Sequence, residues 1–339
     1  MARLGLGALT TAASDTDGLR PVNLHSDLRP LADLIELAFA DSMDSAGHSA
    51  IREMRYLSHR GAALRLITRF NSLAEGISLG FVYMAAGELV GNVSIYPANF
   101  PRELGETWLL ANVAVHPRHQ RRGIAHQLVA SSIEALRARG ASRVILQADT
   151  ANEAALSLYE AVGFRYERAW IHWRRSSRAR AATPPRHDFH ITRLRRNEGA
   201  AEFALAQAAR PNSRGGLGWL KPLRHGDFCP SLWRRAQQWL SMNSAEKLII
   251  RSAADREILA SCWLENAPIG FGRVQARMFA SPQIDHRAYA QALLNNLVSR
   301  YERATILVEH PRDDEVVSDL LRQQQFKARR ELWHMRLDF

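Results

Sequence analysis

Hydrophobic and polar positions in the first half of the chain follow two periods, which take turns along the sequence. A period near two residues, or a run of aromatic and β-branched residues, is typical of strands, and a period near 3.6 residues is typical of helices. We predict strands over 21–28, 81–85, 89–96, 108–115, 143–149 and 164–174, and helices over 31–40, 49–58, 124–136 and 152–162. The turn residues 86–88 join the second and third strands as a hairpin.

The length of the chain predicts two domains. A chain of 339 residues exceeds what one hydrophobic core usually serves, so each half is expected to bury its own core. The stretch 176–186 contains Ser-Ser, Ala-Ala and Pro-Pro pairs with several Arg residues, which is typical of a linker. We therefore predict a first domain over 1–177, a linker over 178–187 and a second domain over 188–339.

The positive charge of the chain raises the question of nucleic-acid binding. The formal net charge is +11, and Lys occurs only at 221, 247 and 327, so Arg supplies the other 42 of the 45 basic residues. These Arg residues are scattered and form no basic tail, which argues against a nucleic-acid partner. A positive surface would still attract an anionic cofactor.

Cysteine content and hydropathy indicate where the protein works and argue against disulfide, metal and membrane-spanning features. The two cysteines, Cys229 and Cys262, form no pair or quartet at metal-ligand spacing, so we expect neither a disulfide framework nor a metal site. The N-terminal stretch 1–13 lacks an apolar run of signal-peptide length, and no later stretch approaches membrane-spanning length. We expect a soluble, cytoplasmic protein without a membrane partner.

The candidate chemistry concentrates where the strand over 108–115 leads into the next helix, at Val113-Ala-Val-His-Pro-Arg-His-Gln-Arg-Arg-Gly-Ile-Ala-His126. A chain that turns directly from a strand into a helix leaves backbone N–H groups unpaired, and the helix dipole favours a negative charge there. Gly123 has no Cβ and allows phosphates to approach closely, and Ala125 is small. An ordinary strand-to-helix loop with a flexible Gly is the alternative interpretation.

Two motifs in this half resemble the GNAT acetyltransferase superfamily. Gln120-Arg-Arg-Gly-Ile-Ala125 is similar to the pyrophosphate loop R/Q-x-x-G-x-G/A of that family. Asn152-Glu-Ala-Ala-Leu-Ser-Leu-Tyr-Glu-Ala-Val-Gly-Phe164 is similar to its N-x-x-A-x-x-L-Y-x-x-x-G-F segment. The resemblance covers about 19–174 and implies an α/β (α+β) fold with a mixed, mostly antiparallel central sheet flanked by helices.

The resemblance also implies acetyl-CoA as co-substrate and assigns the residues that bind it. The exposed main chain of Val113 and Val115 would pair with the pantetheine amides, and Asn152 would lie near that arm, although it is equally suited to cap a helix. The implied cofactor-binding residues are Val113, Ala114, Val115, Gln120, Arg121, Arg122, Gly123, Ile124, Ala125, His126 and Asn152.

Tyr159 is the implied catalytic residue. In the implied reaction an amine attacks the thioester directly, the N–H of Val113 polarises the carbonyl oxygen, and a Tyr hydroxyl gives a proton to the leaving thiolate. Tyr159 stands where the family carries this acid. It also lies on the apolar face of its helix, where an aromatic residue of the core would be expected.

The general base is left open by the sequence. Gln147 stands where some relatives carry a Glu, and an amide cannot take up a full proton. Glu103, Glu106, Asp149 and His116 are candidates, and a water chain is another. No residue is assigned as the base.

The second half resembles a degenerate copy of the first. An alignment without gaps sets 282–294 against 117–129, so that Ala288 stands opposite Gly123 and Asp285 opposite Gln120. At the second motif, Asp314, Leu321 and Gln325 stand opposite Asn152, Tyr159 and Gly163. We predict a second GNAT-like domain without catalysis, with Trp219, Trp233, Trp239, Trp263 and Trp333 as aromatic residues that can wall a pocket.

These observations predict a tandem acetyl-CoA-dependent N-acetyltransferase with an active N-terminal domain, acting on a primary amine of a small molecule or peptide. The arrangement resembles the mycothiol synthase type of double acetyltransferase, in which the C-terminal half is the active one, so the acceptor cannot be carried over. A non-catalytic acyl-CoA sensor and a basic nucleic-acid-binding protein are the alternatives. Acyl chain length and oligomeric state stay open.

Overall fold

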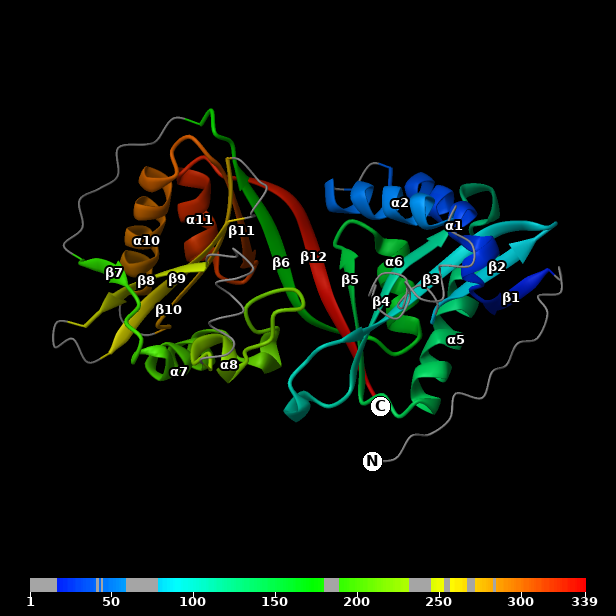
Figure 1. Ribbon diagram of the computed structural model, residues 1–339, viewed down its shortest axis with the longest axis horizontal. Coiled ribbons are helices and arrows are strands. Elements are labelled where there is room, and N and C mark those ends of the chain that lie inside the picture. The colour runs from blue at the N-terminus through cyan, green and yellow to red at the C-terminus, as the bar shows by residue number, and fades with distance from the viewer. Residues whose placement is uncertain are drawn as a thin grey trace. The chain divides into compact units, whose positions relative to one another are not determined.

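The chain forms two compact units in a computed structural model (Figure 1). The structure describes residues 17–40, 43, 45–58, 79–179, 189–231, 245–252, 257–266, 272–282 and 285–339. Unit 1 comprises Met1–Ala98, Glu106–Leu146 and Asp338–Phe339, and unit 2 comprises Asn99–Gly105 and Gln147–Leu337. The division follows residue contacts and passes through a strand, so the domain boundaries proposed from the linker composition stay a prediction.

Unit 1 is a sheet with helices on both faces. Its strands lie in the order β1-β2-β3-β4-β5, and every neighbouring pair is antiparallel except β4 and β5, which are parallel. Helices α1 and α5 both pack on β3 and β4, from opposite sides of the sheet (Figure 1). The elements are β1 (Gly18–Pro21), α1 (Leu24–Ala38), α2 (Ser45–Ser58), β2 (Phe81–Ala85), β3 (Glu88–Ala98), β4 (Thr107–Val115), the 3₁₀ turn η3 (Pro117–His119), α5 (Ile124–Ala138) and β5 (Arg143–Asp149).

The first strand is shorter than the sequence pattern predicts. The strand expected over 21–28 is wrong beyond residue 21, because helix α1 already begins at residue 24. The side chain of Asn23 caps this helix by accepting a hydrogen bond from the His25 N–H at 3.0 Å, and Asp27 accepts one from the Asn23 N–H at 2.7 Å. These two bonds satisfy backbone donors at the start of the helix, which favours helix over strand.

Unit 2 is a second sheet with helices on both faces. Its strands lie in the order β12-β6-β11-β10-β9-β8-β7, antiparallel except for the parallel pair β10 and β11. Residues of α10 and α11 share one buried cluster with the sheet, and residues of α7 and α8 share another. The elements are the 3₁₀ turn η2 (Arg102–Leu104), α6 (Glu153–Ala161), β6 (Arg165–Arg175), β7 (Ile191–Arg193), α7 (Gly199–Ala209), the 3₁₀ turn η4 (Asn212–Arg214), α8 (His225–Phe228), β8 (Ala245–Arg251), β9 (Ile258–Asn266), β10 (Arg273–Ala280), α10 (His286–Arg300), β11 (Thr305–Pro311), α11 (Glu315–Gln323) and β12 (Lys327–Asp338).

Strand β6 has both of its neighbours from the last 35 residues of the chain. It pairs antiparallel with β11, from Ile306 opposite Arg175 to Pro311 opposite Trp170. On its other edge it pairs antiparallel with β12, with two register shifts along the way. Both edges of β6 are therefore paired only when β11 and β12 are in place.

The two halves repeat the same order of elements at a constant spacing. Helix α10 begins 162 residues after α5, β11 begins 162 residues after β5, and α11 and β12 follow α6 and β6 at the same distance. The helix caps repeat as well: Asn152 and Asp314 each accept a hydrogen bond from a backbone N–H of their own helix. This regular spacing indicates a duplicated architecture.

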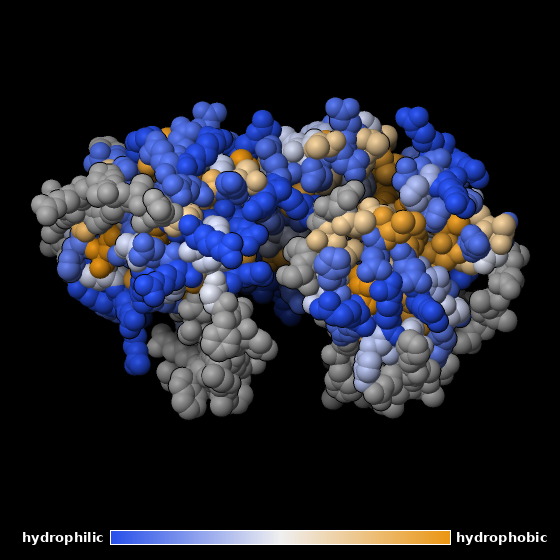
Figure 2. Space-filling view, turned by 90° about the horizontal axis from the view of Figure 1, so that it is seen from above, coloured by the Kyte–Doolittle hydropathy of each residue, from blue (hydrophilic) through white to orange (hydrophobic). Residues whose placement is uncertain are grey.

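The predicted mixed α/β fold with a mostly antiparallel sheet is confirmed. Strands over 81–85 and 143–149 match β2 and β5 residue for residue, and the predicted linker lies largely outside the described residues. On the face shown in Figure 2, hydrophilic residues predominate, with hydrophobic colour in small areas between them. No helix within the described residues combines the length and the apolar character needed to cross a membrane.

Candidate active site

A bulge interrupts β4 just before the predicted cofactor loop. The register with β3 jumps from Asn92 opposite Ala114 to Ser94 opposite Ala111, which leaves Val113 without a partner residue on β3. Asn112 takes up the extra length in a left-handed conformation with φ of 52°. A bulge of this kind turns main-chain groups out of the ladder and bends the strand.

Three polar side chains hold the bulge in place, and sequence reasoning missed them. The Asn92 amide donates to the main-chain oxygen of Asn112 at 2.9 Å, and the Asn112 amide donates to the Ser94 hydroxyl at 3.3 Å. Asn92 and Ser94 are fully buried. Polar residues inside otherwise apolar strands were the available signal, because a buried polar group needs a hydrogen-bond partner.

The edge of β4 that faces β5 becomes free toward its end. Parallel pairing between the two strands covers only Thr107–Leu109 with Arg143–Ile145. Beyond Leu109 the main chain of β4, which includes Val113, Ala114 and Val115, has no partner residue on β5 within this fully described stretch. Unpaired strand groups can bind an extended amide chain as an added strand.

The loop that follows β4 is shaped by its own side chains. The Gln120 amide donates to the main-chain oxygen of Val115 at 3.2 Å, and Nδ1 of His116 accepts from the Arg118 N–H at 3.2 Å. Arg121 and Gly123 both have left-handed backbones, with φ of 62° and 76°. The loop is thereby fixed by its own contacts.

The start of α5 presents a run of unused backbone donors. The first bond into the helix runs from the Gln127 N–H to the Gly123 oxygen at 3.0 Å, and no described residue accepts from the N–H groups of 121–126. The first turn of α5 carries no acidic residue, and a Cβ added to Gly123 would meet no atom within 4 Å. Open space, free donors and the positive helix end fit the pyrophosphate of a coenzyme A thioester.

The predicted loop residues differ in what they can offer a ligand. The side chains of Gln120, Arg121, Arg122 and His126 are exposed, so all of these can reach a bound anion, whereas Ala114 and Ile124 are buried and can contribute only main chain. Ala125 is half-buried at the second helical position. The loop therefore combines backbone donors with two exposed guanidinium groups.

Asn152 is the cap of α6. Its Oδ1 accepts a hydrogen bond from the Ala155 N–H at 3.1 Å, and the side chain is exposed. The capping role is thus present in the structure. The amide N–H₂ group has no partner among the described residues and is available to a ligand.

Tyr159 lies buried on α6, with 6% of its surface exposed. Its ring meets Phe164 edge to face at 5.9 Å between centroids, and its hydroxyl has no hydrogen-bond partner in the described part of the chain. Burial raises the pKa of Tyr159 to about 12. The hydroxyl is therefore protonated at neutral pH, and it is better suited to donate a hydrogen bond to a thiolate than to release its proton completely.

The structure singles out no general base among the four candidates. Glu103 and Glu106 are exposed, Asp149 accepts from the Ala151 N–H at 3.1 Å, and Nδ1 of His116 is engaged within the loop. Gln147 instead contacts a histidine from the last strand of the chain, a contact that sequence reasoning did not find.

The counterpart of the loop in unit 2 is shorter. Five residues separate β10 from α10, against eight between β4 and α5. Asp285, with φ of 64°, caps α10 in the left-handed conformation that Gly123 adopts at α5. The alignment of Ala288 with Gly123 is therefore wrong, because it ignored the three-residue difference, and Ala288 lies inside α10.

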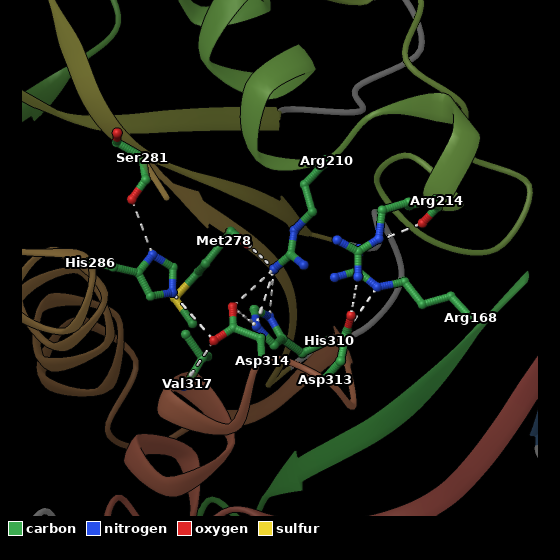
Figure 3. A network of polar contacts seen from close by, with 10 residues as sticks. All are labelled: Arg168, Arg210, Arg214, Met278, Ser281, His286, His310, Asp313, Asp314 and Val317. Carbon is green, nitrogen blue, oxygen red and sulfur yellow. Dashed lines mark hydrogen bonds and ion pairs between the residues drawn. The ribbon is translucent and has the colours of Figure 1, made fainter. Parts of the chain in front are cut away.

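A buried ion network surrounds the cap of α11 in the same unit (Figure 3). The Asp314 carboxylate lies 2.9 Å from Nε2 of His310, 3.3 Å from Nε2 of His286 and 3.7 Å from Nη2 of Arg210. Burial alone would raise the pKa of Asp314, but the hydrogen bonds from both histidines and the Arg210 charge lower it overall. Burial and the same Arg210 charge lower the pKa of His310 to about 4. The side chain that caps α11 is thus fully engaged by other side chains of the protein, whereas the amide N–H₂ of Asn152, at the corresponding position in the first half, has no partner among the described residues.

Comparisons with known proteins agree with these features. Residues 48–164 match the Acetyltransferase (GNAT) family. The chain is 35% identical over 65 residues to N-alpha-acetyltransferase 30 of Schizosaccharomyces pombe, a match that covers 19% of this chain and 43% of that protein. It is 40% identical over 55 residues to [Ribosomal protein bS18]-alanine N-acetyltransferase of Escherichia coli, covering 16% of this chain and 37% of that protein. The chain thus spans less than half the length of either relative.

A solved structure shows the same fold over both halves. The GCN5-related N-acetyltransferase from Sphaerobacter thermophilus is similar with a TM-score of 0.60 at 15% identity, over 94% of this chain and 95% of that one. The matched segment 48–164 therefore identifies a GNAT acetyltransferase domain in the chain, and both halves share the fold of this neighbour.

Proposed function

We propose that the chain is an N-acetyltransferase that moves the acetyl group of acetyl-CoA to a primary amine of a small molecule or peptide. The observation that carries this proposal is the start of α5, where the N–H groups of 121–126 are unused and Gly123 leaves open space. A sensor would need the same loop, but it would have no use for a protonated hydroxyl at Tyr159 that can donate to the leaving thiolate.

Each proposed binding residue has a physical task. The backbone of 121–126 and the exposed Arg121 and Arg122 would hold the pyrophosphate, and the free edge of β4 at Val113 and Val115 would hold the pantetheine amides. Asn152 would donate its remaining amide N–H to the same arm. Gln120 would act indirectly, because its amide fixes the end of β4 through Val115.

The proposed chemistry is a direct transfer. The amine nitrogen forms a bond to the acetyl carbon while the carbon–sulfur bond breaks, and the amine loses a proton to water. The N–H of Val113, which the bulge releases from the ladder, would stabilise the negative charge that develops on the acetyl oxygen. Tyr159 would donate a hydrogen bond to the departing thiolate, which takes up a proton from solvent.

The relatives suggest which acceptor to test first. One of them is named an N-alpha-acetyltransferase and another a ribosomal-protein alanine N-acetyltransferase, so the α-amine of a peptide is the first candidate. We also propose that the second domain, over 188–339, is non-catalytic, since its loop is shorter and an ion network surrounds its second helix cap.

An amine-panel screen with acetyl-CoA tests the proposal. The full chain is mixed with acetyl-CoA and either an alanine-initiated peptide, a lysine side-chain analogue or a small primary amine, and release of free thiol is followed. We expect thiol release that depends on one class of amine. Acetyl-CoA binding without thiol release for any amine would favour the sensor instead.

A further inference from the structure

Gln147 and His334 meet although 187 positions separate them in the chain. Nε2 of Gln147, on β5, lies 2.8 Å from Nε2 of His334, on β12. An amide nitrogen can only donate, so the imidazole nitrogen accepts, and the proton of the neutral ring is on Nδ1. The contact requires an uncharged His334.

The surroundings of His334 keep it neutral and fixed. The ring is 2% exposed, stacks on Trp170 at 5.5 Å with 15° between planes, and meets Trp219 at 4.8 Å. Burial lowers the pKa of His334 to about 3, and the nearby His172 and Arg168 act in the same direction. The imidazole therefore stays an acceptor throughout the physiological pH range.

The main chain of Trp219 is itself held by a residue of β11. The Glu309 carboxylate, with 9% of the side chain exposed, accepts a hydrogen bond from the backbone N–H of Trp219 at 2.9 Å. The two indole rings pack against the imidazole, and its Nε2 meets Gln147. The carboxamide is oriented by a rigid partner.

The oxygen of the Gln147 carboxamide does not take part in the contact with His334. Its nitrogen is used by His334, while Oε1 has no hydrogen-bond partner within the described residues, and the side chain is half-buried. Residue 147 also lies two positions beyond Ile145, the last residue of β5 that pairs with β4. An amide oxygen can accept an N–H and orient an amine, but it cannot take up the proton.

We propose that His334 is a positioning residue for acetyl transfer, which holds the Gln147 carboxamide so that its Oε1 accepts an N–H of the acceptor amine. This inference rests on the proposed function. It gives β12 a part in acceptor recognition, because the fixed carboxamide oxygen would orient the amine through its N–H. The amine proton goes to water, and Gln147 only orients the nitrogen lone pair.

His334→Phe is the direct test, because it keeps the aromatic contacts with Trp170 and Trp219 and removes the accepting nitrogen. With an alanine-initiated peptide as acceptor, we expect the KM for the peptide to rise about tenfold while the KM for acetyl-CoA stays within twofold. Gln147→Leu should have the same effect, and the double variant should be no worse than either single variant. His190→Phe, which replaces an exposed histidine that the network does not use, is the matched control, with an unchanged KM for the peptide.

Nuclear magnetic resonance of the ¹⁵N-labelled imidazole provides a readout without activity. The wild-type protein should show His334 with its proton on Nδ1 at pH 7, and Gln147→Leu should shift the Nε2 resonance. An unchanged KM for the peptide in His334→Phe, or equal rises in both KM values, would overturn the inference. Failure of the wild type to bind acetyl-CoA in calorimetry would instead refute the proposed function, and the inference with it.

Discussion

Replacing Gly123 with Val tests the loop most directly, since the structure separates its effect on the fold from its effect on binding. A Cβ at this position meets no atom within 4 Å, so the protein itself has room for the side chain. The cost to the fold is the left-handed backbone, with φ of 76°, which is about 1–3 kcal/mol for a residue other than Gly. A domain with a typical stability of about 5–15 kcal/mol tolerates that loss.

The effect on acetyl-CoA should be larger. The added methyl groups occupy the space in front of the N–H groups of 121–126 and would break one or two hydrogen bonds to a charged phosphate, each worth about 1.5–3 kcal/mol. The loss of one such bond corresponds to a dissociation constant roughly 10- to 140-fold higher, and the loss of a second multiplies that effect.

Gly140 supplies the matched control at the other end of α5. Its φ is 79°, and a Cβ there also meets nothing within 4 Å, so Gly140→Val carries the same backbone strain away from the loop. Isothermal titration calorimetry with acetyl-CoA and thermal unfolding would be measured for both variants. Similar Tm losses with weakened binding only in Gly123→Val are expected. Equal acetyl-CoA affinity in the two variants would refute the loop assignment.

Three further outcomes are expected. Tyr159→Phe should lower kcat about 100-fold with little change in acetyl-CoA affinity, whereas turnover within twofold of wild type would leave Tyr159 as a core aromatic. His310, with its folded pKa lowered to about 4 against about 6.5 when unfolded, contributes stability above pH 6.5 that is lost as the pH falls toward 4, by up to about 3 kcal/mol. Urea unfolding of His310→Asn should show a shallower fall over that pH range, and an unchanged slope would contradict this. A fragment of residues 1–186 lacks both neighbours of β6 and should aggregate, so a soluble, fully active fragment would show that the second half is dispensable.

The strands and helices around the loop could be predicted because their hydrophobic patterns are strong. The strand over 108–115 and the helix from 124 agree with β4 and α5 to within a residue or two at each end. The predicted strand over 21–28 failed because the pattern of apolar residues says nothing of a cap, and Asn23 with Asp27 decides the start of α1.

The contacts that shape the site depend on distances that a linear pattern does not contain. The clamp of Asn92 and Ser94 on Asn112 joins two strands, and the contact between Gln147 and His334 joins residues 187 positions apart. The alignment of Ala288 failed for a different reason, since a gapless comparison cannot detect a connection that is three residues shorter.

The position of β6 between two strands from the end of the chain has a consequence for synthesis on the ribosome. At about 5–20 residues per second, the 163 residues between the end of β6 and the end of β12 take roughly 8–33 seconds to emerge. Until β11 emerges both edges of β6 lack their partners, and the edge that pairs with β12 stays open to other nascent chains until the end of that interval. A chain that stops before Lys327 never receives β12, so the pairing of β6 depends on residues that are made more than 150 positions after it.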